Sequence, residues 1–352
     1  MAAESILVVG AGAIGGVIAA KLTRAGHDVM VLDANAAHVE RLRSPGLTFE
    51  QAGATGVTIP IRAVTDPAEL TRRFDYALVS VKAAQLVRAL PPLVERDVVD
   101  TYVALGNGLV LDRIGAIVGS RSLMVGIVEW GATNLGAGHV RQTTVAPIVF
   151  GESHGSPRQR TAKLARILSD TAEVRISENM RGQIWSKLLL NSTFSGLGAV
   201  SGLLYGEVVA DAAGRRLAFG LWREGCTVAT AHGVALGQVL GIDPADLVVG
   251  PGGPTAAQDR VLDAAMAKVS STKASMLQDL ERGVETEVDV INAAVVSHGR
   301  LHDVPTPLNE QVVRIIHDCE RGRTRPDPRH FLELLRTNSD AAGREWATWT
   351  TK

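Results

Sequence analysis

A short glycine-rich segment constrains the fold of this chain more than any other part of its sequence. The run from Ser5 to Val9 is mostly apolar and β-branched, and the next six residues read Gly-Ala-Gly-Ala-Ile-Gly. An apolar helical pattern follows at once and ends at Gly26. A buried strand, a tight turn and a helix, in this order, form the context in which the spacing G-x-G-x-x-G has a structural meaning.

Each glycine of this segment has its own physical role. The first allows a tight turn, the second lets a pyrophosphate approach the backbone, and the third lets the helix pack closely on the strand. The start of the helix then offers unpaired N–H groups to the phosphates. We therefore expect a dinucleotide-binding turn, and not merely a tight turn, formed by Gly10, Ala11, Gly12, Ala13, Ile14 and Gly15.

Asp33 indicates which dinucleotide the turn would bind. It ends a second predicted strand, residues 28–32, and no Arg or Lys lies between Asp33 and Arg41. A carboxylate at this place accepts hydrogen bonds from the ribose hydroxyls of NAD and repels the 2′-phosphate of NADP. The cofactor is expected to be NADH or NADPH, with NADH favoured. The alternative is that Asp33 only caps the helix expected to begin near Ala36.

The first half of the chain alternates strands with helices, which predicts a Rossmann-type doubly wound sheet over residues 1–177. Ligands bind such sheets at the carboxyl ends of the strands. Lys82 and Asn107 follow two of these ends and are therefore cofactor-site candidates. The alternatives are a solvated lysine and an asparagine in a glycine-flanked turn. The further strands are expected at residues 76–81, 102–105, 124–128 and 145–150.

The second half of the chain has a helical pattern. Strand-type runs disappear beyond about Ser177, so we expect an all-α domain over residues 178–335 and a polar tail over 336–352. The segment 183–204 is apolar nearly all round and should be buried.

One polar stripe interrupts this apolar segment. Lys187, Asn191 and Ser195 recur at intervals of four residues. Polar groups on a buried helix must be paired or face a cleft. A partly desolvated lysine has a lowered pKa, which suits a general acid. The alternative is a lysine whose long chain reaches the surface between apolar neighbours.

Two later segments resemble helix starts. Ser275 and Gln278 have the spacing of a capping box, with Gly283 as the expected helix stop. Residues 286–289 form a second box-like start and place Glu287 in the first turn of a helix. Because helix N-termini bind carboxylates, Ser275 could hold the acid end of a substrate. The alternative for both segments is capping alone.

Composition excludes several classes of function. The formal net charge of −1 argues against nucleic acid or anionic membranes as partners. The two cysteines, Cys226 and Cys319, form no C-x-x-C, and no H-E-x-x-H occurs, so no metal site or disulfide scaffold is expected. The apolar stretch 6–20 lacks a basic flank and contains glycines, unlike a signal peptide. With no run long enough to span a membrane, a cytoplasmic protein is expected.

Taken together, the motifs resemble the ketopantoate reductase (2-dehydropantoate 2-reductase) family. The resemblance extends from Gly10 to Pro307, nearly the whole chain. Its specific signatures are Val81-Lys82-Ala83-Ala84-Gln85, Gly106-Asn107-Gly108, Trp185-Ser186-Lys187-Leu188-Leu189-Leu190-Asn191, and Ser275-Met276-Leu277-Gln278-Asp279 followed by Thr286-Glu287-Val288-Asp289.

The resemblance implies an activity and a role for each motif residue. The activity is NAD(P)H-dependent reduction of a branched 2-oxo acid, most simply ketopantoate to pantoate in pantothenate biosynthesis. Lys187 is the implied general acid, and Glu287 orients that lysine and the substrate. The remaining roles are contact with substrate and nicotinamide for Asn107, with substrate for Asn191 and Ser275, and with the cofactor for Lys82.

Three positions depart from the family pattern. Asp33 stands where members that use NADPH usually carry an Arg, and Gly106 where a Gln is common. Ser195 stands where an Asn often reads the far hydroxyl of ketopantoate, so discrimination for that substrate should be weaker.

These departures leave two alternatives open. One is an NAD-dependent D-2-hydroxyacid dehydrogenase for another C3-branched or aromatic 2-oxo acid, and the other is an NADH-binding redox sensor without turnover. Amphipathic helices in the second half could form a homodimer interface.

Overall fold

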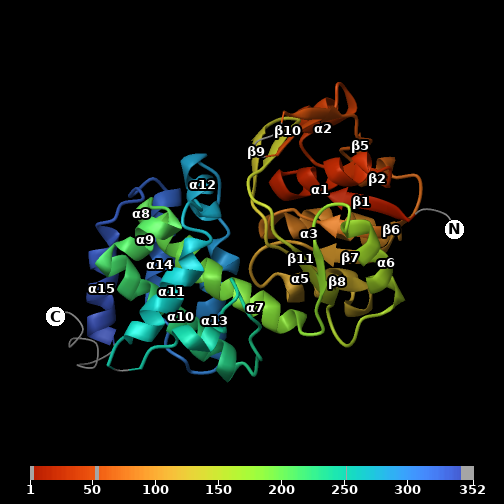
Figure 1. The fold of residues 1–352 in the computed structure, drawn as a ribbon. Helices are drawn as coiled ribbons and strands as arrows, with labels where there is room; N and C mark the ends of the chain where they lie inside the picture. The colour runs from red at the N-terminus through yellow and green to blue at the C-terminus, as the bar shows by residue number, and fades with distance from the viewer. Residues whose placement is uncertain (1–3, 52–54, 251, 342–352) are drawn as a thin grey trace. The chain divides into compact units, whose positions relative to one another are not determined.

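The computed structural model describes residues 4–51, 55–250 and 252–341. The chain divides after Met180 into two compact units, which are described one at a time (Figure 1). The first unit is a mixed α/β domain built on a mostly parallel sheet, and the second is helical. The predicted fold class, a Rossmann-type domain followed by an all-α domain, is confirmed.

The large sheet of the first unit has eight strands in the order β12-β11-β8-β7-β6-β1-β2-β5. The chain leaves β1 for β2 on one side and later returns to pair β6 with the other side of β1, which makes β1 the point where strand order reverses. The pairings are parallel except between β8 and β11. The strands are β1 (Ser5–Val9), β2 (Asp28–Leu32), β5 (Ala63–Val64), β6 (Phe74–Val79), β7 (Val99–Ala104), β8 (Leu123–Val128), β11 (Ile148–Glu152) and β12 (Val174–Ile176).

The six strands predicted for this unit are all present. The two at residues 5–9 and 28–32 have the predicted bounds, and the other four differ from their predicted bounds by one to three residues at one or both ends. Such shifts are expected because strand ends depend on pairing partners that the local pattern does not show. The helices of the unit are α1 (Ala13–Arg24), α2 (Ala36–Arg43), α3 (Leu86–Ala89), α4 (Pro91–Glu95), α5 (Leu111–Val118) and α6 (Gln159–Leu168).

A second sheet in the same unit was not predicted. Its four strands lie in the order β4 (Val57–Ile59), β3 (Leu47–Gln51), β10 (His139–Gln142) and β9 (Ala132–Gly136). The central pairing joins β3 to β10, which are about 90 residues apart in sequence. Short strands joined over such a distance leave no local signal, because each is too short to show a clear period.

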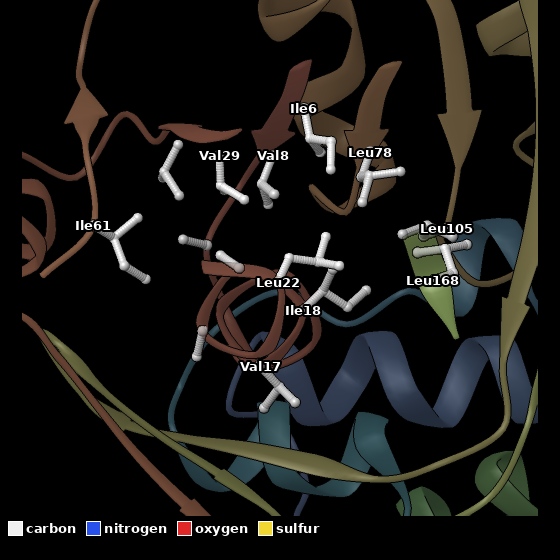
Figure 2. Packing of buried hydrophobic residues seen from close by; sticks show 14 of the residues in the cluster. Ile6, Val8, Val17, Ile18, Leu22, Val29, Ile61, Leu78, Leu105 and Leu168 are labelled. Atoms are coloured by element: carbon white, nitrogen blue, oxygen red, sulfur yellow. The ribbon is translucent and has the colours of Figure 1, made fainter. Parts of the chain in front are cut away.

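Helix α1 lies between the two sheets. Figure 2 shows Ile18 and Leu22 directed at the strands of the large sheet, whereas Val17 points the opposite way. On that opposite side, a Cβ atom on Gly16 would lie 2.9 Å from Cγ1 of Val140 in β10. The burial of α1 on both sides explains why its sequence is apolar almost all round.

The described part of the second unit contains helices and isolated bridges but no strand. The long helix α10 is its centre, since α8, α9, α13, α14 and α15 all pack against it. None of the helices in the described ranges is long and apolar enough to cross a membrane. The helices are α7 (Met180–Leu190), a π-helical turn (Asn191–Ser195), α8 (Gly196–Ser201), α9 (Tyr205–Ala210), α10 (Ala212–Ala231), α11 (Ala256–Ala267), α12 (Ser275–Glu281), α13 (Asn292–Leu301), α14 (Pro307–Glu320) and α15 (His330–Ala341).

The predicted polar tail begins at residue 336. Residues 336–341 belong to α15, and residues 342–352 lie outside the described residues.

The predicted capping box at Ser275 is wrong. Ser275 is the first residue of α12, and the residue that precedes the helix is Ala274, which makes no side-chain cap. The side chain of Gln278 donates instead to the main-chain oxygen of Lys273, at 3.2 Å. Ala274 is fully buried, so the N-cap position of α12 is occupied by an apolar core residue and not by Ser275. The expected helix stop is correct, since Gly283 follows α12 with φ +66°.

The second predicted helix start is correct only in part. Oγ1 of Thr286 accepts a hydrogen bond from the N–H of Val288, at 3.2 Å. This bond begins a short 3-10 turn, Val288–Val290, which Glu287 precedes, and α13 begins later at Asn292.

Candidate functional site

The carboxyl ends of four neighbouring strands lie in register. Val9 of β1 pairs with Leu32 of β2 and with Val79 of β6, and Val79 pairs with Ala104 of β7. The residues that follow these ends therefore share one edge of the sheet. They are Gly10, Asp33, Ser80 to Lys82, and Leu105 to Asn107, with Lys82 and Asn107 both half-buried.

The three glycines of the turn differ in backbone conformation and in the space around their Cα atoms. Gly10 has φ +87°, which a side chain disfavours. A Cβ atom on Gly15 would overlap the carbonyl oxygen of Gly10 and the hydroxyl of Ser80. A Cβ atom on Gly12 would meet no protein atom within 4 Å. The turn is thus closed around Gly10 and Gly15 and open at Gly12.

The start of α1 fits a pyrophosphate group. Gly12 is the N-cap residue and provides no side chain to cap the helix, and the first turn contains no acidic residue. Residues 12–14 are partly exposed. Their N–H groups and the positive end of the helix dipole suit a dianionic ligand. Residues 10–15 are therefore the part of this unit that can hold the phosphates of a dinucleotide.

Asp33 is tied to this turn. Its Oδ2 accepts a hydrogen bond from the N–H of Ala11, at 2.8 Å, and its Oδ1 accepts one from the N–H of Asn35, at 2.9 Å. Helix α2 is capped by Asn35, whose Oδ1 accepts from the N–H of His38. The interpretation of Asp33 as the cap of α2 is therefore wrong, and its carboxylate is held beside the glycine turn.

His38 is a part of this site that the sequence analysis missed. Its Nε2 lies 2.9 Å from the carbonyl oxygen of Ala11, and its Nδ1 accepts the N–H of Gly138, also at 2.9 Å. Because a main-chain N–H can only donate, Nδ1 has no proton, and Nε2 donates to Ala11. The imidazole is 3% exposed. It joins the glycine turn to the loop between β9 and β10.

Ser80 was missed as well. Its hydroxyl donates to the carbonyl oxygen of Gly10, at 2.5 Å. A polar residue directly after the buried strand β6 was the one available signal for it. No comparable local signal existed for His38, whose partner Gly138 is 100 residues away.

In the helical unit, Lys187 and Asn191 lie on one partly exposed side of α7 and its continuation. Both are half-buried, whereas Trp185, Leu188 and Leu189 are buried. They are the first two of the three residues in the predicted polar stripe.

The stripe breaks at Ser195, which is 1% exposed. The helix changes from α to π at Asn191, so the four-residue spacing no longer keeps Ser195 on the same side. Ser195 lies beside the buried phenol of Tyr205. Burial raises the pKa of Tyr205 to about 12.

A buried polar network supports the π-turn. The side-chain amide of Asn292 donates to the carbonyl oxygen of Ser192, at 2.8 Å, and to Oδ1 of Asn309, at 2.9 Å. Asn309 in turn donates through Nδ2 to Oε2 of Glu224, at 2.8 Å. Glu224 also accepts the main-chain N–H groups of Leu308 and Asn309, at 2.9 and 3.0 Å, at the start of α14. None of these side chains is among the residues predicted from the sequence.

Glu287 is half-buried, and residues on both sides of it contact the end of α14. Oε1 of Glu320 accepts both the N–H and the hydroxyl of Thr286, each at 2.8 Å. His317 lies 2.7 Å from Oε2 of Glu320 and 3.2 Å from Oδ1 of Asp289. Although burial acts to raise the pKa of Glu320, the hydrogen bonds from Thr286 and His317 hold it below its usual value.

Ser275 is exposed at the start of α12. This helix packs against the π-turn and against α8, where Cβ of Ala274 lies 3.0 Å from the position of a Cβ on Gly198. Ser275 and Asn191 therefore belong to adjoining elements of the helical unit.

Neither metal nor thiol chemistry is indicated. In the portions of the chain that the structure covers, no group of three or more His, Cys, Asp or Glu side chains is arranged to hold a metal ion. Burial raises the pKa of Cys226 to about 12 and that of Cys319 to about 11, so both thiols stay protonated and unreactive near neutral pH.

Comparison with known proteins identifies the family. The family model described as "Ketopantoate reductase PanE/ApbA" matches residues 6–155, and the one described as "Ketopantoate reductase PanE/ApbA C terminal" matches residues 179–320. The chain belongs to the ketopantoate reductase family. As a member of this family it is an NAD(P)-dependent oxidoreductase that acts on a CH–OH group.

Relatives of this ketopantoate reductase family member cover nearly its whole length. A 2-dehydropantoate 2-reductase of Mesorhizobium japonicum is 30% identical over 342 residues, which cover 90% of this chain and 98% of the relative. A PanE/ApbA family ketopantoate reductase from Ralstonia eutropha has a similar structure, with a TM-score of 0.77, 25% identity and coverage of 91% and 99%. D-mandelate dehydrogenase, solved with NADH and anilino(oxo)acetate, shares the fold with a TM-score of 0.77, 22% identity and the same coverage.

The different surroundings of Gly12 and Gly15 predict different effects of the same substitution. Gly12→Ala should fold with nearly unchanged thermal stability but weaken NADH binding about tenfold or more, because the methyl group occupies the open side of the turn. Gly15→Ala should lower the melting temperature by several degrees, because its methyl overlaps main-chain atoms. Titration of NADH fluorescence and thermal unfolding measure the two effects. Unchanged NADH affinity in Gly12→Ala would contradict this interpretation of the turn.

The raised pKa of Glu224 predicts that the stability of the fold depends on pH. Burial raises its pKa to about 7 from the usual 4.5 of a glutamate, against the hydrogen bonds from Leu308 and Asn309. Between these two pH values the folded state binds a proton that the unfolded chain has released. The free energy of unfolding should therefore fall as pH rises through this window, by at most about 1.4 kcal/mol per pH unit.

Urea unfolding at several pH values tests this dependence. In the Glu224→Gln variant, the free energy of unfolding should no longer fall with pH through this window. The control Glu310→Gln, on the exposed side of α14, should retain it. Equal slopes in all three proteins would show that Glu224 does not titrate in this range.

Proposed function

We propose that this enzyme reduces a branched 2-oxo acid to its 2-hydroxy acid with NADH, and that ketopantoate is the first substrate to test. The observation that carries the proposal is that Lys187 and Asn191, four residues apart, are both half-buried beside the buried residues Leu188 and Leu189. Membership of the ketopantoate reductase family and the names of its relatives support the choice of substrate.

Reduction of a ketone requires a hydride at carbon and a proton at oxygen. The nicotinamide, when bound, supplies the hydride. Lys187 holds the proton at Nζ and donates it to the ketone oxygen, and its positive charge stabilises the alkoxide as it develops. Glu287 orients this ammonium group and the substrate. Asn191 and Ser275 bind the substrate, and Asn107 contacts substrate and nicotinamide.

The preference for NADH rests on Asp33. Its carboxylate is held beside the glycine turn by the N–H groups of Ala11 and Asn35. Free lone pairs on both oxygens can accept bonds from ribose hydroxyls, whereas a 2′-phosphate would meet a fixed negative charge. Lys82 is proposed to contact the cofactor from the end of the neighbouring strand.

A second candidate substrate is an aromatic or differently branched 2-oxo acid. Ser195 has a short side chain that is buried against Tyr205, so an amide that could read the far hydroxyl of ketopantoate is missing at this position. D-mandelate dehydrogenase, which has the same fold, was solved with NADH and an aryl oxo acid compound. Both observations favour this candidate over strict specificity for ketopantoate.

Steady-state kinetics test the proposal directly. The oxidation of NADH and of NADPH is measured with ketopantoate, with 3-methyl-2-oxobutanoate and with benzoylformate. NADH should give a kcat/KM about tenfold or more above NADPH, and Asp33→Asn should narrow this ratio. The highest kcat/KM with benzoylformate would assign the enzyme to the second candidate. Absence of turnover with every acid and both nucleotides would refute the proposal.

Lys187→Ala tests the proton donor. Loss of the general acid should lower kcat roughly 100-fold or more, while the dissociation constant of NADH stays the same. The control is Lys163→Ala, a half-exposed lysine that pairs with Glu4 on the first unit and should leave kcat unchanged. Wild-type activity in Lys187→Ala would eliminate this mechanism.

A further inference from the structure

The π-helical turn at Asn191–Ser195 lies directly after the helix that carries Lys187. A π-turn forms i→i+5 hydrogen bonds and is rare, because it gives up the regular i→i+4 pattern of the α-helix. Such a turn persists only where the surrounding structure compensates for the loss. Here the compensating contact is the bond between the side chain of Asn292 and the carbonyl oxygen of Ser192.

The amide of Asn292 is used fully as a donor. One hydrogen goes to Ser192 and the other to Asn309, at 2.8 and 2.9 Å. Both asparagines are 0% exposed. In the observed orientation Oδ1 is the one polar atom of this amide without a hydrogen bond. If the amide were turned over, its oxygen would face two other oxygens and both hydrogen bonds that it donates would be lost, which costs more. The orientation of this amide is therefore unique.

The orientation is imposed from the far end of the network. Glu224 accepts from Nδ2 of Asn309, so Oδ1 of Asn309 is directed at Asn292. The same carboxylate accepts two main-chain N–H groups at the start of α14, which fix its own position. From Glu224 through Asn309 to Asn292, each side chain thus accepts a hydrogen bond from the next one.

From this geometry we propose that Asn292 is a positioning residue for Lys187 and Asn191, and that Asn309 and Glu224 orient it. Ser192 immediately follows Asn191, so fixing its carbonyl group fixes the helix register at the point where the polar side of the helix ends. The role assigned to Lys187 rests on the proposed function.

Gly196 provides an independent way to disturb this contact. A Cβ atom at this position would lie 3.2 Å from both Nδ2 and Oδ1 of Asn292 and 3.3 Å from Cγ1 of Val312. Its φ of −61° suits any residue, so the effect of a substitution comes from crowding of the amide and not from backbone strain.

The main test is Asn292→Asp, which keeps the shape of the side chain and leaves at most one donor, the hydroxyl of a protonated carboxyl group. With NADH and the best 2-oxo acid of the wild type, kcat should fall about tenfold or more, while the dissociation constant of NADH remains unchanged. The primary isotope effect with 4-deuterated NADH should increase, because misplacement of Lys187 slows the chemical step. Backbone hydrogen exchange over residues 191–196 should become faster, with no change in α1.

The matched control is Ser201→Ala in α8. Its hydroxyl is 2% exposed and donates to the carbonyl oxygen of Leu197, at 2.7 Å, but makes no bond to the π-turn network. It should lose stability with kcat and the isotope effect unchanged. If Asn292→Asp folds poorly, Gly196→Ala is measured in its place. It should produce smaller changes of the same sign in kcat, in the isotope effect and in hydrogen exchange.

The possible outcomes separate this inference from the proposed function. Unchanged hydrogen exchange over residues 191–196 in a folded Asn292 or Gly196 variant overturns the role of Asn292 in the π-turn, whatever the enzyme reduces. Faster exchange with wild-type kcat and isotope effect overturns the link to Lys187. A wild type that reduces none of the oxo acids refutes the proposed function instead, and the exchange measurement still decides the structural part.

Discussion

The close approach of α1 to the carboxyl end of β1 is the constraint on which the nucleotide-binding unit depends. It is possible only because Gly15 has no side chain to meet the carbonyl of Gly10. The peptide between them is then held from both sides, since Asp33 accepts the N–H of Ala11 and His38 donates to its carbonyl. With this turn fixed, the register of the sheet brings the ends of β2, β6 and β7 to the same edge.

In the helical unit, α14 has the corresponding role although it contains no predicted site residue. Its first turn supplies two N–H groups to Glu224 and the amide of Asn309 to the network that reaches the π-turn. Its last turn holds the segment around Glu287 through Glu320 and His317. One helix therefore supports the two segments that carry Lys187, Asn191 and Glu287.

The two carboxylates that anchor α14 differ in their electrostatics. Glu224 is surrounded by the core and meets only neutral donors, so burial dominates and its pKa rises to about 7. Glu320 lies closer to the surface, where hydrogen bonds from Thr286 and His317 outweigh burial and its pKa falls. The network behind the π-turn is consequently neutral over part of the physiological pH range, whereas the anchor beside Glu287 remains charged.

The sequence by itself determined six strands of the large sheet, the glycine turn, the division into an α/β and a helical half, and the resemblance that singled out Lys187 and Glu287, because these depend on local patterns of a few residues. It did not determine the second sheet, the contacts of His38 or the network from Glu224 to Asn292. Each of these depends on at least one contact between residues that are 84 to 100 positions apart in the chain, and no local period records such contacts. The stripe from Lys187 to Ser195 failed at its last residue for the same reason. A spacing of four assumes a regular helix, and the tertiary structure has a π-turn here, where Asn292 donates to the carbonyl oxygen of Ser192.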